Sequence, residues 1–304
     1  MATRPSKIWL YRLLLKASQT SSKHGFTLIE LLVAIIISAL VVTGLLFLVV
    51  EMLQLDRREF VLNQTQQDMQ RSLAYITNDL EEAVYVYSTP TTVTDNLNFA
   101  ADEVPVLAFW RPDPLSASEE AELNASACAT DECEVLRIRR YTFSLVVYLL
   151  KPNQAGDVWD GQSRIVRYEL PKYTGIDPLT STTGYVDPSL PGSSFANWVP
   201  DLNPDGRTAV LTDYVDASTV ALTNLQTCDD FGTNYYRSPA SATSFFSCIQ
   251  DNDAALGNVN QEVFVFLRGN ALDGRPGLIN EQNEGSDNPT LQSRVQVRGV
   301  LDKQ

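Results

Sequence analysis

The chain has 304 residues, of which 44% are hydrophobic and 20% charged, so it can bury a sizeable core in one large or two small domains. With 37 acidic and 23 basic residues, its formal net charge is −14, which argues against nucleic acid or an anionic membrane surface as a partner. The single histidine, His24, lies in a basic amino-terminal segment that we expect to be removed. Its loss excludes Ser-His-Asp and Cys-His catalysis and histidine-ligated metal sites, and no carboxylate pair stands out, so we expect no enzyme activity.

Residues 1–25 contain basic residues but no acidic one. The apolar stretch Ile8–Leu15 within them is interrupted by Arg12 and is too short to cross a bilayer. We expect residues 1–25 to be a cleaved leader, and its loss removes five basic residues, leaving 18 basic against 37 acidic residues and a net charge of −19. These five residues are Arg4, Lys7, Arg12, Lys16 and Lys23. Such a basic flank predicts that the amino terminus faces the cytoplasm.

An uncharged stretch, Leu31–Val50, follows and predicts a transmembrane helix. About 20 helical residues at roughly 1.5 Å each span about 30 Å, the thickness of the hydrocarbon core of a bilayer. The stretch is longer than the apolar region of an ordinary signal peptide. We therefore assign residues 26–50 to a single span of the inner (plasma) membrane and expect the rest of the chain to be extracytoplasmic.

Glu30 stands at the start of the apolar stretch, four residues after Phe26. A bare carboxylate is costly in hydrocarbon and requires a partner. One explanation is an acid in the first turn of a membrane helix, where the helix dipole favours it. The complete string Gly25-Phe26-Thr27-Leu28-Ile29-Glu30 indicates another, because it resembles the cleavage and assembly signature of type IV prepilins and pseudopilins.

This resemblance implies a role for each residue. A prepilin peptidase would cut after Gly25, Phe26 would become an N-methylated amino terminus, and Glu30 would pair with the amine of a neighbouring subunit. The implied partners are other major and minor pseudopilins or pilins, the prepilin peptidase, an assembly platform in the inner membrane, and membrane lipid. The protein would reside in the membrane and then in the filament.

Residues 51–88 predict an amphipathic continuation of the helix. No Pro or Gly occurs in this stretch, Ser88-Thr89-Pro90 predicts its end, and a break near Gly44 or Asp56–Arg58 stays open. Apolar residues recur three or four positions apart, at Met69, Leu73, Ile76, Leu80, Val84 and Tyr87. The segment resembles the first helix of minor pilins and pseudopilins of the PilW or general-secretion J type, and is most similar to cyanobacterial hormogonium polysaccharide secretion pseudopilins.

Residues 89–304 predict a β-rich extracytoplasmic domain, with a long Pro-rich loop at 171–208. Strands are expected at Val104–Trp110, Val135–Tyr141, Phe143–Leu150, Arg164–Leu170, Ala209–Val215, Glu262–Arg268 and Arg294–Leu301. Strands that follow one another without helices favour antiparallel pairing. The predicted fold class is therefore α+β and pilin-like: a long amino-terminal transmembrane and amphipathic helix packed on a mainly antiparallel sheet.

The four cysteines lie beyond the apolar stretch, in a compartment that we expect to be oxidising. They allow three disulfide pairings, of which proximity favours Cys128–Cys133 with Cys228–Cys248. A zinc site of all four is the alternative, although the usual C-x2-C spacing is missing.

Asp201, Asn203 and Asp205 match the opening of a calcium loop. Thr212 stands where the final Glu of such a loop would be, and an ordinary turn explains the pattern better. We expect no cofactor, with calcium as the one candidate.

The sequence thus predicts a minor pseudopilin, a structural subunit of a type IV pilus-like or type II secretion-like filament that supports polysaccharide secretion and gliding motility. One alternative is a minor type IV pilin that initiates pilus assembly. Another is a membrane-anchored extracytoplasmic protein for glycan binding or adhesion. In that case sugars would stack on loop aromatics: Trp159, Tyr173, Tyr185, Trp198, Tyr235 and Tyr236.

Overall fold

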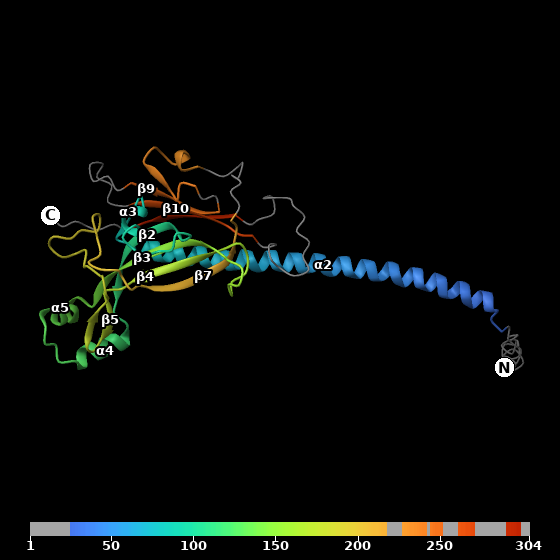
Figure 1. The fold of residues 1–304 in the computed structure, drawn as a ribbon, viewed down its shortest axis with the longest axis horizontal. Coiled ribbons are helices and arrows are strands. Elements are labelled where there is room, and N and C mark those ends of the chain that lie inside the picture. The colour runs from blue at the N-terminus through green and yellow to red at the C-terminus, as the bar shows by residue number, and fades with distance from the viewer. Residues whose placement is uncertain (1–24, 218–226, 242–243, 252–260, 271–289, 299–304) are drawn as a thin grey trace, which may run out of the picture. The chain divides into compact units, whose positions relative to one another are not determined.

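The computed structural model describes residues 25–217, 227–241, 244–251, 261–270 and 290–298 (Figure 1). The chain divides into two compact units, Met1–Leu55 and Asp56–Gln304, which we take separately. Residues 1–24 of the expected leader, His24 included, lie outside the described residues.

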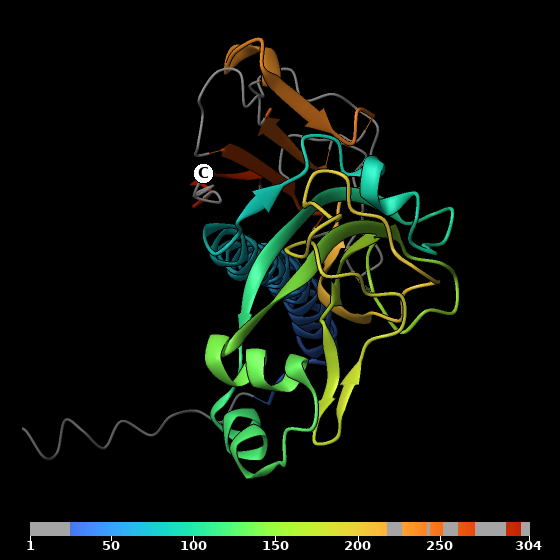
Figure 2. The same ribbon diagram turned by 90° about the vertical axis from the view of Figure 1, so that its left-hand side faces the viewer.

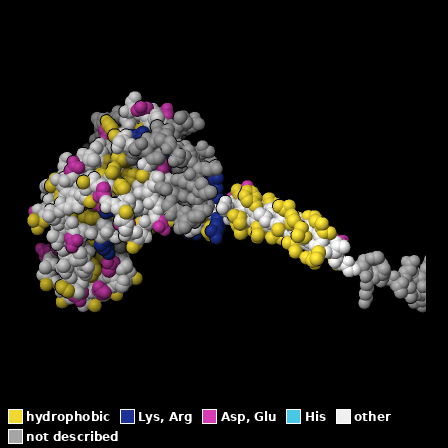
Figure 3. All heavy atoms as spheres, turned by 45° about the vertical axis from the view of Figure 1, so that its right-hand side comes forward, with side chains coloured by type: hydrophobic (Ala, Val, Ile, Leu, Met, Phe, Trp, Pro, Cys, Tyr) yellow, Lys and Arg dark blue, Asp and Glu magenta, His cyan; other side chains and the backbone are white. Residues whose placement is uncertain are grey.

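The first unit contains the start of helix α2 (Leu28–Glu81). Every side chain from Gly25 to Leu55 is exposed, and Figure 3 shows hydrophobic side chains over the visible face of this stretch, with acidic ones near its two ends. Among the described residues, α2 is the one helix long and apolar enough to cross a membrane. The helix continues through Gly44 without a break, and next to it the Thr43 hydroxyl donates to the Ala39 carbonyl at 2.7 Å.

In the second unit, α2 buries the stripe that its sequence predicts. Met69, Ile76 and Leu80 are fully buried and Leu73 nearly so. The helix ends at Glu81, however, earlier than the expected end at Ser88. The backbone from Val84 to Tyr87 instead pairs with β2 (Val104–Pro114) and forms the short strand β1 (Tyr85–Val86). These ladder hydrogen bonds outweigh the helical pattern, which continued to Tyr87.

A five-stranded antiparallel sheet of order β1-β2-β3-β4-β7 covers one side of α2. Its remaining strands are β3 (Tyr141–Pro152), β4 (Ser163–Leu170) and β7 (Arg207–Val215). Phe109, Val146 and Ile165 face the helix stripe. The opposite face buries Trp110 and Val147 against Trp198. Both faces are therefore covered, as the apolar content of these strands requires.

A second antiparallel sheet has the order β11-β10-β9-β8 and shares the core around α2 (Figure 2). Its strands are β8 (Tyr235–Ser238), β9 (Phe245–Gln250), β10 (Glu262–Arg268) and β11 (Thr290–Gln296). Val263, Val265 and Leu267 join the α2 stripe, whereas Phe264 and Phe266 pack on the other face. The strand expected at Arg294–Leu301 begins earlier, at Thr290, and ends earlier, at Gln296, and residues 299–301 lie outside the described part.

The connection between β2 and β3 and the connection between β4 and β7 form a satellite lobe that the sequence did not predict. It comprises α4 (Ala117–Ala125), α5 (Asp131–Arg139) and the hairpin β5 (Tyr173–Ile176)–β6 (Leu179–Ser181), which Figures 1 and 2 show away from the second sheet. The residues 171–208 are therefore not one long loop. Two short elements complete the described chain, α3 (Thr91–Thr94) and the 3-10 turn Cys228–Asp230.

The strand expected at Val135–Tyr141 is wrong, because α5 occupies most of it. The Thr130 hydroxyl accepts from the Cys133 N–H and caps the helix, which ends at Arg140 in the left-handed region (φ 59°). Acidic residues in its first turn and basic residues in its last complement the helix dipole. These end signals outweigh the β-branched residues in between.

The close approach of β10 to α2 generates a prediction. A Cβ at Gly269 would overlap the Met69 sulfur, and Met69 is fully buried. Gly269→Ala should lower the free energy of unfolding by about 1–3 kcal/mol, because the core must shift to admit the methyl group. Denaturant unfolding of the detergent-solubilised protein, followed by near-ultraviolet circular dichroism, measures this. Gly175→Ala is the control, since a Cβ there meets only ordinary contacts. Equal stability of both variants would contradict the packing.

Candidate functional site

The segment Gly25–Thr27 belongs to no helix or strand and precedes the first turn of α2. Thr27 starts the helix, because its carbonyl accepts from the Leu31 N–H at 3.1 Å and its hydroxyl from the Glu30 N–H at 3.3 Å. Phe26 is 80% exposed, and a Cβ at Gly25 would have no heavy atom within 4 Å. The Gly25–Phe26 peptide bond therefore lies outside the helix, and no residue of the described part of the chain covers it.

Glu30 lies in the first turn of α2, where its charge faces the positive end of the helix dipole. Its side chain is exposed, and its carboxylate has no ion-pair partner among the described residues. The uncharged stretch from Leu31 to Val50 follows directly. In hydrocarbon this carboxylate would need a cation from outside the described chain.

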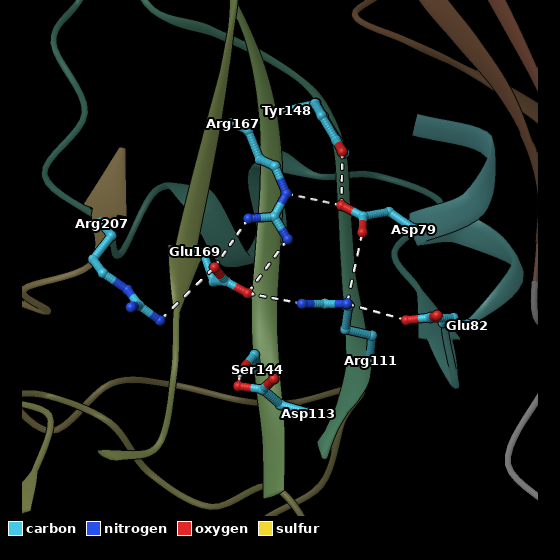
Figure 4. Close-up of polar contacts among 9 residues, drawn as sticks. All are labelled: Asp79, Glu82, Arg111, Asp113, Ser144, Tyr148, Arg167, Glu169 and Arg207. Atoms are coloured by element: carbon cyan, nitrogen blue, oxygen red, sulfur yellow. Dashed lines mark hydrogen bonds and ion pairs between the residues drawn. The ribbon is translucent and has the colours of Figure 1, made fainter. Parts of the chain in front are cut away.

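A second polar feature, which the sequence did not predict, lies between α2 and the five-stranded sheet. We name it the Asp79 cluster; it consists of Asp79, Glu82, Arg111, Tyr148, Arg167 and Glu169 (Figure 4). Asp79 Oδ2 accepts from the Tyr148 hydroxyl at 2.7 Å and from Arg167 Nε at 2.8 Å. One carboxylate on the helix thus bonds side chains from β3 and β4.

Arg111 extends the cluster across β2. Its Nη1 lies 3.0 Å from Glu82 Oε2 and 3.7 Å from Asp79 Oδ1, and its Nη2 lies 3.1 Å from Glu169 Oε1. Glu169 Oε2 also pairs with Arg167 Nη1 at 3.0 Å. Three acids and two guanidinium groups alternate, so each buried charge has an opposite neighbour.

The pKa shifts of Glu169, Arg167 and Arg111 favour the charged forms of these three side chains. Burial alone would raise the pKa of Glu169, but hydrogen bonds and charge from Arg167 and Arg111 lower it below its usual value. Burial would lower the pKa of Arg167, and Glu169 and Asp79 raise it instead. Burial and the neighbouring Asp79 charge raise the pKa of Tyr148. Arg167 and Arg111 thus favour the ionised form of Glu169, and the ion pairs and hydrogen bonds of the cluster fix the position of α2 on the sheet.

The remaining predicted site residues lie apart from both features. Cys128 is bonded to Cys133 and Cys228 to Cys248, the pairs closest in sequence. Cys128–Cys133 lies in the satellite lobe and Cys228–Cys248 joins the second sheet to the 3-10 turn.

The calcium candidates lie in an exposed turn. The backbone N–H groups of Asp201 and Asp205 donate to the carbonyls of Gly184 and Thr183, and Asn203 is exposed between them. Within the described ranges, no three His, Cys, Asp or Glu side chains are placed to hold a metal ion.

Three of the six loop aromatics serve local packing or hydrogen bonding. Trp198 is buried and its Nε1–H donates to the Val186 carbonyl, and the Tyr185 hydroxyl donates to the Phe143 carbonyl. The Tyr235 hydroxyl donates to Glu262. The other three aromatics retain exposed surface or line a pocket: Trp159, Tyr173 and Tyr236.

The Asp79 cluster yields a prediction on stability. Asp79→Ala leaves Arg167 and the Tyr148 hydroxyl without their shared acceptor, so the free energy of unfolding should fall by about 3–5 kcal/mol. Asp68→Ala, which removes an exposed ion pair with Arg71 on the same helix, should cost less than about 1 kcal/mol. Denaturant unfolding compares the two variants, and similar losses would contradict the role of the cluster.

One comparison with known proteins identifies the amino-terminal segment. Residues 20–46 match the family model described as the prokaryotic N-terminal methylation motif. This range includes the exposed Gly25–Phe26 bond, Glu30 and most of the apolar stretch. No curated protein and no solved structure matches the chain significantly. The motif, the apolar helix and the antiparallel sheets together support a membrane-anchored, pilin-like protein that carries the prepilin-type processing signal.

Proposed function

We propose that this protein is a minor pseudopilin, a structural subunit of a type IV pilus-like or type II secretion-like filament. The observation that carries the proposal is the methylation motif at residues 20–46, placed on an exposed Gly25–Phe26 bond at the start of an exposed apolar helix. Cleavage there would release the amine of Phe26 and leave the anchor intact. Residues 26–50 would be held in the membrane first and then in the filament.

The apolar surface of the stretch 31–50 supports this assembly. Its large side chains are about half exposed or more, far beyond what a soluble monomer presents as one patch. In a bilayer lipid covers them, and in a filament the same helices of other subunits do. Without water, close packing holds such a bundle together, and Ala34, Ala39 and Gly44 let neighbouring backbones approach.

Glu30 would set the position of one subunit against the next. The amine of Phe26 would be the cation that processing creates, near the same end of the apolar stretch as the carboxylate. Within one chain, Phe26 and Glu30 stand four residues apart with the Thr27 cap between them. An amine from a neighbouring subunit would neutralise Glu30, and this ion pair would stabilise one axial offset between the two helices.

The finer assignment rests on resemblance. The segment 51–88 resembles PilW and general-secretion J-type proteins, and most closely pseudopilins of polysaccharide secretion, so we propose a role in polysaccharide secretion and gliding motility. Its partners would be other pseudopilins, the prepilin peptidase and the inner-membrane assembly platform. The role is structural rather than enzymatic, and the acidic chain takes no nucleic acid. A minor type IV pilin that initiates pilus assembly would use the same segment.

Processing is tested at Gly25. Gly25→Leu should abolish cleavage, because a side chain at the residue before the cut would occupy space that glycine leaves open. Mass spectrometry of the purified protein should find Phe26, methylated, as the first residue of the wild type and an intact leader in the variant. Gly44→Leu, in the same helix, should be cleaved normally. Cleavage of Gly25→Leu at this bond would contradict the processing site.

Assembly is tested at Glu30. Glu30→Ala should leave membrane insertion and cleavage unchanged, but should reduce incorporation into filaments at least about tenfold, since the amine of the neighbouring subunit loses its partner. Immunoblots of membranes and of sheared filaments measure both quantities. Glu51→Ala, an acid at the other end of the apolar stretch, is the matched control. Wild-type incorporation of Glu30→Ala would refute the pairing.

A further inference from the structure

A pocket lies between the satellite lobe and the end of the five-stranded sheet. Its volume is about 390 Å³, within the range of about 300–1,000 Å³ that is usual for small-molecule sites. The first turns and last turn of α5, the start of β3 and the start of β5 all contribute to its wall. The connections β2–β3 and β4–β7 leave the same end of the sheet, because Pro114 pairs with Tyr141 and Leu170 pairs with Leu145. The topology therefore brings these distant segments together.

The wall of the pocket is braced. The Cys128–Cys133 disulfide ties the α4–α5 connection to α5. Arg137 Nη2 donates to the carbonyls of Leu123 and Ser126, at 3.0 and 2.9 Å, and so holds α5 against the end of α4. This arrangement pre-forms the site and reduces the ordering cost of binding a ligand.

The floor of the pocket is a closed polar network. Lys172 Nζ lies 3.0 Å from Glu132 Oε1 and 3.0 Å from Asp187 Oδ2, and the Tyr173 hydroxyl donates to Glu132 Oε1 at 2.8 Å. The side chains of Lys172 and Asp187 are only 15% and 9% exposed. Burial would lower the pKa of Lys172, but both acids raise it, so the floor stays charged and internally paired.

The rim, in contrast, has unused surface and unused hydrogen-bonding groups. Tyr141 is 41% exposed, Val135 45% and Leu190 52%. Asp131, Arg139 and the Tyr141 hydroxyl line the pocket, and within the described part of the chain none of these three side chains has a hydrogen-bond or ion-pair partner. Carboxylate acceptors, guanidinium donors and an aromatic face thus surround one apolar hollow.

We propose that this pocket binds a neutral oligosaccharide, with a sugar ring against Tyr141 and its hydroxyls bonded to Asp131 and Arg139. A sugar hydroxyl both donates and accepts, which matches a rim that offers both kinds of group. The C–H face of a sugar ring is apolar and suits an aromatic and aliphatic wall. Sugar binding at this pocket would not depend on assembly of the protein into a filament.

Charge selects against other ligands. The lining carries three acids and two bases, namely Asp131, Glu132, Asp187, Arg139 and Lys172, so the total is close to neutral. A strongly anionic ligand would meet Asp131, whose carboxylate has no ion-pair partner within the described residues, and a cation would meet Arg139. The three acids do not form a metal site, because Lys172 occupies the position between Glu132 and Asp187.

The test is direct binding by the full-length protein in a detergent without a sugar head group, such as a dimethylamine oxide. Saturation-transfer NMR and calorimetry would screen neutral glucan, galactan, mannan and xylan tetrasaccharides beside uronate oligosaccharides. We expect at least one neutral sugar to bind with a Kd below about 1 mM. Tyr141→Ala should weaken it at least about tenfold through the lost ring contact. Leu190→Trp, which fills the mouth of the pocket, should abolish it.

Matched controls separate binding from folding. Tyr236→Ala removes another tyrosine that is 48% exposed, on β8, and should leave binding unchanged. All variants should unfold as the wild type does. Absence of binding by every neutral sugar, or equal binding by Tyr141→Ala and Leu190→Trp, would overturn the proposal. The proposal would also be overturned if the wild type bound no sugar but retained peptides from a random nonapeptide library, and Leu190→Trp did not retain them. That result would make the pocket a peptide site. The assay needs neither cleavage nor assembly, so its result is independent of the proposed filament role.

Discussion

The structure of the amino-terminal segment depends on one unsatisfied requirement: an apolar helix surface, with a carboxylate at its start, has no cover within the described chain. The stretch 31–50 cannot stay in water, and Glu30 cannot stay unpaired in hydrocarbon. Lipid would cover the apolar surface but would not supply a cation for Glu30. A second subunit with a free amine would do both, and processing at the bond after Gly25 would create such an amine.

In the second unit, the later part of the same helix is packed inside the domain. Here the stripe from Met69 to Leu80 is buried by two sheets, and apolar packing alone would tolerate small shifts of the helix along its axis. The Asp79 cluster removes that tolerance, because its hydrogen bonds to β3 and β4 have strict geometry. Its charges are balanced by arginines, so the buried carboxylate stabilises one arrangement of the helix on the sheet.

Much of this fold could be predicted from the sequence because much of its signal is local. The period of the stripe revealed α2, and apolar runs revealed β2, β3, β4, β7 and β10. Two missed features depended on distant partners: the helix ends at Glu81 because β1 pairs with β2, and Asp79 lies beside the stripe with no local sign of Arg167. The helix α5 was missed for another reason, because its local cap signals at Thr130 and Arg140 were outweighed by the β-branched content of residues 135–141. The processing motif was visible because its chemistry lies in consecutive residues.

The pocket could not be predicted for a topological reason that also bears on its use. Its wall combines residues from 131 to 190, and only the antiparallel order of β2, β3, β4 and β7 brings both connections to one end of the sheet. Insertions at that end can change without disturbing the α2 stripe or the Asp79 cluster, since neither contributes to the lobe. The proposed binding site in the lobe is therefore structurally independent of the anchor and of the Asp79 cluster. The disulfide at Cys128–Cys133 fits this division, because it reinforces the small apolar cluster of the lobe, to which Cys133 belongs.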